Sequence, residues 1–428
     1  MDTLYKHPSF QIAEVIGLIY RSGLTTTSGG NISMLGDHGN IWITPAAVDK
    51  GSLTRADIVK VEPGGEVHGL HRPSSELPFH QAIYAQRPDL GAIIHAHPPA
   101  LVAFSIVRKI PDTRVIPQAV HLCGAVGYAP YELPGSEALG ESIASAFAEG
   151  HNAVIMENHG TVVGGRDLNE AFQRFETLEF CAMTIIRAHQ LGSPVYLRQD
   201  QVDAFERQSM DMEEFEHPVP GAEERLLRHQ IVEFIGRACT QGLMIGSHGT
   251  ISARLRGEDF LINPTGFDRR NVDLSDLVLV RGQSRAMGRR PSRAVLLHRE
   301  IYRRHPEIGC VISTQSPHAT AFAVAGVPMD TRTIPESYIL LEDIPLLDFG
   351  SQLGKGEAVA EALGRHTPIV LLRNDSRLVT GASILETFDR LEVAEFSATS
   401  LIESRSLGDL SPIGKQELEQ LRKKFLNG

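Results

Sequence analysis

Cysteine is scarce in this chain, and its few copies lie far apart. The 428 residues include four cysteines, and no two of them form a Cys-x-x-Cys pair. Each has apolar or small neighbours, which is typical of a reduced core residue. The sequence therefore argues against a disulfide framework and against a cysteine-ligated zinc site. The four are Cys123, Cys181, Cys239 and Cys310.

Long apolar runs and an excess of basic charge are also missing. No stretch approaches the ~18 apolar residues that cross a bilayer, and Met1–Lys6 lacks the basic-then-apolar order of a signal peptide. The formal net charge is −11, whereas a nucleic-acid-binding protein needs a basic face. We therefore expect a cytoplasmic protein that binds neither membranes nor nucleic acids.

The main organisational feature is an internal repeat. Segments of the first half recur in the second half at an offset of 216 to 219 residues. The clearest pair is Ser-Gly-Gly-Asn-Ile-Ser at 28–33 and Ser-His-Gly-Thr-Ile-Ser at 247–252. So long an offset indicates two copies of one domain. The other matched pairs are 43–45 with 262–264, 80–88 with 298–306, 112–117 with 330–335, and 168–182 with 384–398.

Composition places the boundary between the copies after residue 197. The chain turns acidic over 211–216 and then carries Pro-Val-Pro-Gly at 218–221. Such a stretch is typical of a solvent-exposed linker. We predict a first domain over 1–197, a linker over 198–222 and a second domain over 223–428.

Hydrophobic spacing predicts that each copy is an α/β domain. In the first copy, apolar residues recur at helical spacing over 10–20, 78–87 and 168–190. Short apolar runs predict strands over 40–44, 58–61, 91–95 and 153–156.

Two histidines end the strand predicted over 91–95. Residues i and i+2 of a strand point to the same face, so His95 and His97 can reach one metal ion. Pro98 and Pro99 stop the strand at this point, where side chains leave the core for a cleft. The alternative is a pair of hydrogen-bonded histidines at a strand end, and the two residues alone do not decide between these interpretations.

A third histidine and a carboxylate complete a possible catalytic set. His159 follows the strand predicted over 153–156, and Gly160 after it permits close backbone approach. Three imidazoles with an open fourth position are typical of catalytic zinc. Glu76, at the entrance to a predicted helix, can act as a ligand or a general base. The alternatives are a turn histidine and a carboxylate placed to suit a helix N-terminus.

Two turns have the composition of an oxyanion cradle. Ser28–Asn31 and Ser74–Ser75 are rich in hydroxyl, amide and glycine groups. Such groups can bind an anion through side chains and backbone N–H groups. Taken singly, each is also an ordinary turn.

Five motifs together resemble the class II aldolase/adducin family, which includes fuculose- and rhamnulose-phosphate aldolases, ribulose-phosphate 4-epimerase and methylthioribulose-phosphate dehydratase. The resemblance covers about residues 8–197 strongly and about 225–404 more weakly. It implies a three-layer α/β/α fold duplicated in tandem. The motifs are Ser-Gly-Gly-Asn-Ile-Ser at 28–33, Ile-Thr-Pro at 43–45, Pro-Ser-Ser-Glu at 73–76, His-Ala-His-Pro at 95–98 and Asn-His-Gly at 158–160.

The resemblance also implies roles for the matching residues. His95, His97 and His159 would hold Zn²⁺, with Mn²⁺ or Co²⁺ as alternatives. Glu76 would move a proton at the carbon next to a carbonyl. A carbohydrate-like small molecule would bind at the turns, through Gly30, Asn31, Thr44, Ser74 and Ser75.

Two departures from the aldolase pattern concern the phosphate and the acid. The aldolases carry a hydroxyl residue and then glycine after Thr-Pro, where this chain has Ala46 and Ala47, and Lys50 is the compensating cation that we expect. The aldolases place a proton-donating tyrosine just past the position of Ile116, which this chain lacks. The candidate acids are His121, Tyr128, Tyr131 and a residue from a neighbouring subunit.

The second copy has lost the metal set. The repeat aligns His95 with Ser313, His97 with Gln315, His159 with Asp375 and Glu76 with Ala294, so the second domain is expected to be a degenerate copy. Its expected role is structural, or to line the pocket of the first copy.

We therefore expect a metal-dependent lyase, an aldolase that cleaves a hydroxy-ketone or sugar phosphate through an enediolate, in a homo-oligomer. A decarboxylase, dehydratase or epimerase on the same scaffold is one alternative. A non-catalytic adducin-like binding protein is the other, although an intact metal set argues against it.

Overall fold

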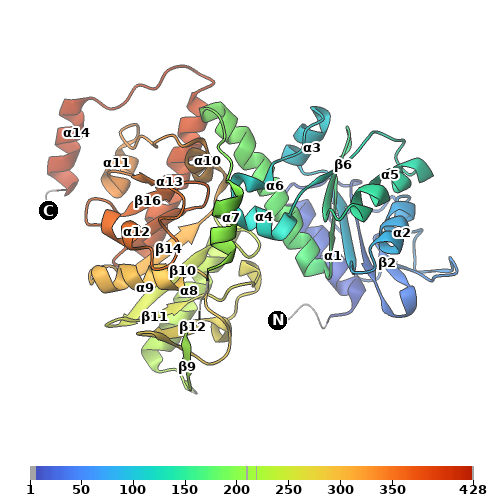
Figure 1. Cartoon of the computed structure of the whole chain (residues 1–428), viewed down its shortest axis with the longest axis horizontal. Helices are drawn as coiled ribbons and strands as arrows, with labels where there is room; N and C mark the ends of the chain where they lie inside the picture. The colour runs from blue at the N-terminus through green and yellow to red at the C-terminus, as the bar shows by residue number, and fades with distance from the viewer. Residues whose placement is uncertain (1–5, 209–210, 218, 427–428) are drawn as a thin grey trace. The chain divides into compact units, whose positions relative to one another are not determined.

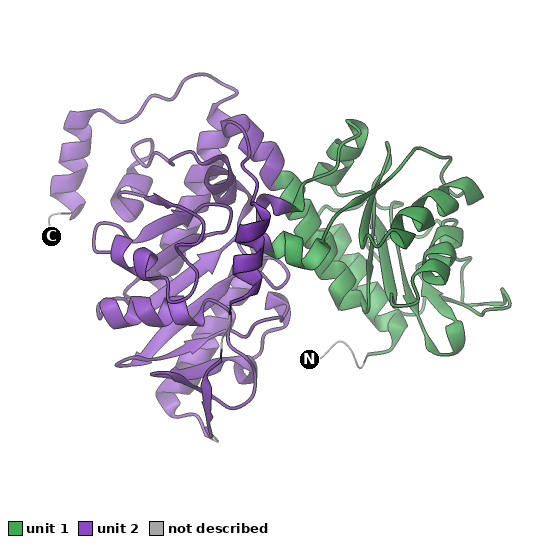
Figure 2. Cartoon of the chain, in the orientation of Figure 1, with its two compact units in different colours: residues 1–113, 118–183 green, residues 114–117, 184–428 purple. Residues whose placement is uncertain are grey.

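The computed structural model describes residues 6–208, 211–217 and 219–426. The chain forms two compact units, which Figure 2 colours separately. Unit 1 comprises residues 1–113 and 118–183, and unit 2 comprises residues 114–117 and 184–428. Each unit is a sheet with packed helices (Figure 1).

Unit 1 is built on an eight-stranded sheet in the order β4-β3-β2-β1-β5-β8-β7-β6. Neighbouring strands are antiparallel except β6 and β7, which are parallel. The strands are β1 (Asn31–Leu35), β2 (Ile41–Ile43), β3 (Val59–Val61), β4 (Val67–His68), β5 (Ala92–Ala96), β6 (Gly127–Ala129), β7 (Ala153–Met156) and β8 (Thr161–Gly165).

Helices cover both faces of this sheet. The buried core between the sheet and α2 and α5 includes Phe79 and Ile83 of α2 and Phe147 of α5. Helix α1 packs on β1 and β2, and Figure 1 shows it with α6 on the opposite side of the sheet from α2 and α5. The helices are α1 (Pro8–Arg21), α2 (Leu77–Gln86), α3 (Pro99–Ile106), α4 (Pro117–Cys123), α5 (Glu137–Ala148) and α6 (Leu168–Leu191), the last of which continues into unit 2.

Unit 2 has a nine-stranded sheet in the order β15-β16-β17-β14-β10-β11-β12-β13-β9. The strands are β9 (Glu213–Phe215), β10 (Thr250–Arg256), β11 (Asp259–Ile262), β12 (Val278–Arg281), β13 (Ser284–Ala286), β14 (Cys310–Thr314), β15 (Leu346–Leu347), β16 (Ile369–Leu372) and β17 (Arg377–Gly381). The helices are α7 (Gln199–Glu206), α8 (Ala222–Thr240), α9 (Val295–Arg304), α10 (Pro317–Ala325), α11 (Pro335–Leu341), α12 (Glu357–Ala362), α13 (Ile384–Ser404) and α14 (Lys415–Leu421).

Strand register shows that the two sheets are copies of one fold. Asn31 lies opposite His95 between β1 and β5, and Thr250 lies opposite Ser313 between β10 and β14. Ser33 lies opposite Ile43 in unit 1, as Ser252 lies opposite Ile262 in unit 2. The predicted α/β fold, duplicated in tandem, is therefore confirmed.

The stretch predicted as a linker contains regular structure. Helix α7 buries Val202 and Phe205, and β9 pairs in parallel with β13 and forms the edge of the sheet. The sequence carries little signal for α7, because the helix has only two buried residues, Val202 and Phe205. The boundaries at 197 and 222 remain predictions.

Among the described residues, no helix has the length and apolarity that a membrane span requires.

A buried ion pair joins the sheet of unit 2 to helix α13. Arg377 of β17 is fully buried, and its Nη1 lies 2.9 Å from Glu395 Oε2. The same carboxylate accepts hydrogen bonds from the backbone N–H groups of His318 and Ala319 at the start of α10. Burial by itself would raise the pKa of Glu395, but the hydrogen bond from His318 and the charge of Arg377 hold it at about 2.

Replacing Glu395 should therefore destabilise the fold. Glu395→Gln leaves the buried Arg377 without its counter-charge, and we expect a loss of about 3 kcal/mol in the free energy of unfolding at pH 7. The native pKa lies below the unfolded value of about 4.3, so the carboxylate stabilises the fold above that pH and less as the pH falls toward 2. The difference between wild type and variant should therefore shrink between pH 5 and pH 3 (roughly the window these pKa values set). Denaturant titrations of both proteins at each pH measure this difference in the free energy of unfolding. Glu403→Gln is the control, because Glu403 is exposed.

Candidate metal centre

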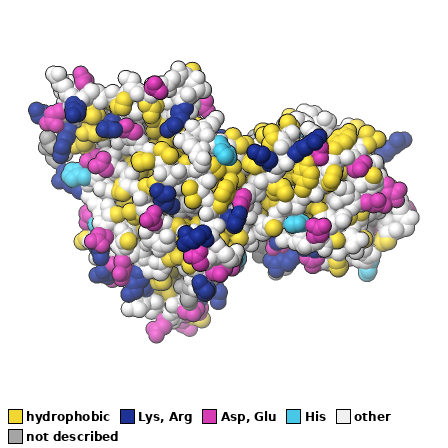
Figure 3. Space-filling view, turned by 45° about the horizontal axis from the view of Figure 1, so that its top comes forward, with side chains coloured by type: hydrophobic (Ala, Val, Ile, Leu, Met, Phe, Trp, Pro, Cys, Tyr) yellow, Lys and Arg dark blue, Asp and Glu magenta, His cyan; other side chains and the backbone are white. Residues whose placement is uncertain are grey.

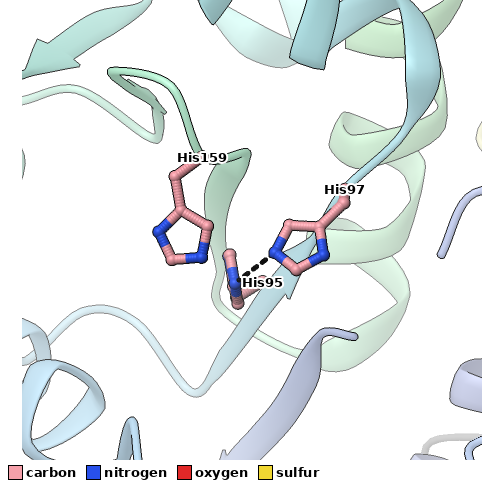
Figure 4. Close-up of side chains that lie close together, drawn as sticks. All are labelled: His95, His97 and His159. Carbon is pink, nitrogen blue, oxygen red and sulfur yellow. Dashed lines mark hydrogen bonds between the residues drawn. The ribbon is translucent and has the colours of Figure 1, made fainter. Parts of the chain in front are cut away.

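Three histidines from two strand ends meet in unit 1 (Figure 4). His95 belongs to β5, His97 follows that strand, and His159 lies in the turn between β7 and β8. One nitrogen from each ring lies within 4.8 Å of the others. The Nε2 atoms of His95 and His97 are 3.1 Å apart. The structure thus brings together the three residues that the sequence predicted as metal ligands.

Local sequence explains why these side chains converge. Strand β5 is apolar up to His95, and Pro99 then begins α3, so the chain leaves the sheet beside His97. On the neighbouring hairpin, Asn158 takes a left-handed conformation with φ 53°, which turns His159 back toward β5. Gly160 has no side chain because a Cβ there would lie 2.6 Å from both the Ala96 carbonyl oxygen and the His97 ring.

The hydrogen bonding of His95 leaves a lone pair facing the other two rings. Its Nδ1 lies 3.0 Å from the carbonyl oxygen of Thr161, which can only accept, so Nδ1 carries the proton. Nε2 is then free to act as a ligand, the arrangement that metal-binding histidines use. Burial lowers the pKa of His95 and of His97 to about 3, and burial also lowers the pKa of His159. The three neutral rings therefore fit a divalent cation.

Glu76 faces this cluster from the start of α2. Its Oε2 lies 3.4 Å from His95 Nε2, and its Oε1 lies 3.8 Å from His159 Nε2. It occupies the N-cap position of α2, but its side chain makes no capping hydrogen bond. The carboxylate is thus turned to the histidines, and the capping alternative is not what the structure shows.

A buried chain of hydrogen bonds holds Glu76 from behind. Asn31 Nδ2 donates to Glu76 Oε2 at 2.6 Å, and Asn31 Oδ1 accepts from His80 Nε2. The other ring nitrogen of His80 contacts Ser33 Oγ at 2.7 Å, and Tyr84 OH contacts the same Oγ at 2.8 Å. Burial lowers the pKa of His80 well below its ordinary value, so the ring is neutral. This series of hydrogen bonds therefore fixes the position of the Asn31 amide and of the Glu76 carboxylate to which it donates.

The sequence prediction missed His80, Ser33 and Tyr84. His80 and Tyr84 have the appearance of core residues of an amphipathic helix, and Ser33 ends the motif at 28–33 but lies beyond the turn, Ser28–Asn31, that is predicted to bind an anion. The repeat did hold a signal, because His298, Ser252 and Tyr302 form the same hydrogen bonds in unit 2.

The residues predicted to bind substrate differ in their exposure and in their hydrogen bonds. Ser75 is exposed, whereas Ser74 is buried with its Oγ 3.3 Å from the Glu76 backbone nitrogen. Thr44 is buried, and its hydroxyl accepts from the backbone of Ile32. Gly30 has φ 73°, and a Cβ there would lie 2.7 Å from the His95 carbonyl oxygen.

The predicted cation is Lys50, the three candidate acids are His121, Tyr128 and Tyr131, and these residues differ in burial and in hydrogen bonding. Lys50 is buried, and its Nζ donates to the Pro45 carbonyl at 2.8 Å, so it braces the loop that carries Ala46 and Ala47. Burial lowers the pKa of Lys50. His121 is exposed on α4, Tyr131 is exposed, and Tyr128 donates to Glu157. The structure does not single out one of them as the acid.

Unit 2 carries no counterpart of the cluster within the residues that the structure describes. The strand register places Ser313 where unit 1 has His95, and Ala294 precedes α9 as Glu76 precedes α2. Gln315 is buried, and Asp375 lies in the turn between β16 and β17.

Comparison with known proteins identifies the family. The sequence profile described as "Class II Aldolase and Adducin N-terminal domain" matches residues 10–186 and 229–402, so both copies of the repeat match it. The chain belongs to the class II aldolase and adducin family. The family resemblance and the fold that the sequence implied are thereby confirmed.

Relatives within the class II aldolase and adducin family differ in their reactions. One is a 3-oxo-tetronate 4-phosphate decarboxylase of Pectobacterium atrosepticum, 35% identical over 180 residues, which are 40% of this chain and 82% of that protein. Another is a 5-deoxy-D-ribulose 1-phosphate aldolase of Bacillus thuringiensis, 32% identical over 186 residues, which are 42% of this chain and 85% of that protein. Among solved structures, YgbL of Klebsiella pneumoniae, a putative aldolase/epimerase/decarboxylase, is 32% identical with a TM-score of 0.42, covering 46% of this chain and 96% of that one.

Removing one histidine should weaken metal binding specifically. His97→Ala takes away one of three converging nitrogens, so we expect affinity for Zn²⁺ to fall by more than about tenfold, since changes outside the ligand shell alone cost 10–100-fold. Metal titration of the purified protein, with metal content by mass spectrometry, measures this. His121→Ala is the matched control because His121 is exposed. Equal binding by both variants would show that the cluster is not the metal site.

Proposed function

We propose that the protein is a divalent-metal-dependent lyase that cleaves a carbon–carbon bond of a hydroxy-ketone or sugar phosphate. The observation that carries the proposal is the approach of Glu76 to three neutral histidines in a family whose named relatives cleave or decarboxylate sugar phosphates. Zn²⁺ is the preferred ion for three imidazoles, with Mn²⁺ and Co²⁺ as alternatives.

The reaction needs a group that stabilises negative charge on oxygen and a group that moves a proton. A divalent ion held by His95, His97 and His159 would polarise the carbonyl and hydroxyl oxygens of the substrate. The hydroxyl on the departing carbon loses its proton to a base as the carbon–carbon bond breaks, so that carbon leaves as an aldehyde. The electron pair of the broken bond stays on the carbon next to the carbonyl, giving an enediolate. Protonation of that carbon completes the cleavage.

Glu76 is the group placed to carry that proton. Asn31 engages Oε2, which leaves Oε1 as the atom for proton transfer. The buried chain through His80 keeps the carboxylate from swinging away, so the proton is held at a fixed distance from the histidines. Asn31 thus acts as a positioning residue for Glu76.

Substrate binding is assigned to the turns beside the cluster. Ser75 has an exposed side chain next to Glu76 in the sequence, and the backbone of Gly30 lies against that of His95. Hydroxyl and backbone N–H groups of this kind suit a phosphate. Lys50 contributes indirectly, because its ammonium is committed to the Pro45 carbonyl.

Decarboxylation is the second candidate. It is favoured by the 35% identity to a 3-oxo-tetronate 4-phosphate decarboxylase, and it needs the same enediolate stabilisation. Dehydration and epimerisation have no comparable support. A purely binding, adducin-like protein has no need of three neutral histidines facing a carboxylate.

Assays on sugar phosphates should separate the candidates. An aldolase releases an aldehyde and a decarboxylase releases CO₂, so both products are measured with 3-keto and 2-keto sugar phosphates and with the unphosphorylated sugars. Chelation should abolish turnover, and Zn²⁺ should restore it. Protein that binds less than about a tenth of an equivalent of Zn²⁺, Mn²⁺ or Co²⁺ and turns over none of these substrates would favour the adducin-like alternative.

Changing Glu76 should separate proton transfer from metal binding. Glu76→Gln keeps the shape of the side chain and should lower kcat by about 10²–10⁴-fold, the usual contribution of a general acid–base group. Metal content should stay near the wild-type value, since the three histidines are untouched. The control is Glu62→Gln. Glu62 follows β3, and its carboxylate is paired with Lys60 of that strand. Full activity of Glu76→Gln would refute the assignment.

A further inference from the structure

Unit 2 contains a cavity of about 750 Å³ that is separate from the position of the metal centre in the repeat. Its walls are the first half of α8, the 3₁₀ turn Leu274–Asp276 and the residues that follow β13. Ser313, Gln315 and Asp375, which hold the positions of the three histidines, are not among the described residues that line it. A cavity of this volume can hold a small organic molecule.

Two walls of the cavity involve elements that the repeat does not match to a helix or strand in the described part of unit 1. Strand β9 pairs with β13 and forms the edge of its sheet, whereas in unit 1 the sheet ends at β4, the strand in the position of β13. Helix α8 begins at Ala222, whereas the repeat matches Pro8, the start of α1, with Leu227. Arg225 lies in this additional length of α8 and lines the cavity. The cavity is therefore a feature of the second copy and not of the shared fold.

The floor of the cavity is apolar. Leu277, Val278 and Ala286 are buried residues of the unit and form part of the lining. Met287 also lines the cavity but is 59% exposed, and its flexible thioether side chain can adapt to the shape of a ligand. Such a floor favours a ligand with an apolar body, because contact with these side chains removes that body from water.

Two of the three arginines that line the cavity have ionic partners. Arg228 Nε donates to Glu224 Oε1 at 2.9 Å, and Arg289 Nε donates to Asp276 Oδ1 at 2.9 Å. Both carboxylates are thus engaged by guanidinium groups. A positively charged ligand would have to compete with these arginines for them.

The third arginine gives the lining an excess of positive charge. Arg225 is exposed, and its Nη1 donates to the Pro220 carbonyl, while no carboxylate in the described part of the chain forms an ion pair with it. The exposed imidazole of His229 lies four residues further along α8 and also lines the cavity. The protein as a whole has a formal net charge of −11, and on the face visible in Figure 3 the Lys and Arg side chains lie among Asp and Glu side chains. A cationic rim over an apolar floor is therefore complementary to an anion.

We propose that this cavity binds a small organic carboxylate, whose apolar body lies on Val278 and Met287 and whose head group pairs with Arg225. The planar guanidinium suits a carboxylate because two parallel N–H donors match its two oxygens. Ser275, which is exposed in the 3₁₀ turn and lines the cavity, adds a hydroxyl donor. The site lies wholly in unit 2 and is independent of the lyase chemistry proposed above.

Fluorescence titration with anilinonaphthalene sulfonate tests the cavity, because this probe joins an anionic group to an apolar aromatic body. The full-length protein should bind the probe in a saturable manner with one displaceable site per chain. Octanoate should displace the probe from that site. Octylammonium has a similar apolar chain and the opposite charge, so it should not.

Two substitutions separate the contribution of space from that of charge. Ser275→Trp fills the cavity from an exposed position and should abolish displaceable binding. Arg225→Glu should weaken octanoate binding by about fivefold or more, because it replaces an attraction by a repulsion of similar size. Ser406→Trp and Arg405→Glu are the matched controls, because both residues are exposed and lie outside the lining, and both variants should bind as the wild type does.

The outcomes that contradict the proposal are distinct. Octanoate binding that survives Ser275→Trp, equal displacement by octylammonium, or a probe signal that does not saturate would overturn the site. Unchanged affinity in Arg225→Glu would overturn the assignment of the head group to Arg225. Circular dichroism checks the folding of each variant, and Met287→Trp takes the place of Ser275→Trp if the latter does not fold. Binding is measured without metal or sugar phosphate, so a failed lyase assay does not affect the result.

Discussion

The hydrogen-bond chain from Tyr84 to Glu76 is the constraint on which the rest of the metal-bearing unit depends. Asn31, His80 and Ser33 each use both a donor and an acceptor, and the chain ends at the Glu76 carboxylate and the Tyr84 hydroxyl. Because a buried polar group without a partner is costly, these hydrogen bonds tie the position of α2 to strand β1. The register of β1 against β5 sets Asn31 opposite His95. Fold and site are therefore fixed by one set of contacts.

The second copy shows which part of that arrangement is structural. Ser252, His298 and Tyr302 keep their hydrogen bonds, while the far ring nitrogen of His298 turns to Ser313, the residue at the position of His95. The inner part of the chain is thus retained where no histidine cluster exists. Loss of the ligands left the core intact, since the sheet and its packed helices do not draw on them.

Sequence reasoning recovered the fold and the histidine cluster for definite physical reasons. Alternation along a strand and a proline stop are local signals, and they place His95 and His97 without knowledge of the rest of the chain. The hidden parts depend on distant partners. The hydroxyl of Thr44 and the ammonium of Lys50 are used by the backbone, which no motif reveals. Helix α7 was missed because only Val202 and Phe205 are buried in it, and the Phe205 ring lies against Arg293, far along the chain.

Asn374 donates hydrogen bonds to the carbonyls of Val115 and Val195 in the same polypeptide, so this contact does not depend on protein concentration. Joining two partners by a chain replaces their concentration with an effective one, which for short connections reaches about the millimolar range. The turn that bears Asp375 is thereby held at any protein concentration, through the hydrogen bonds that Asn374 donates to Val115 and Val195. The turn of unit 2 therefore has a structural role although this unit lacks the histidine ligands, because Asn374 holds the segments at Val115 and Val195 in place.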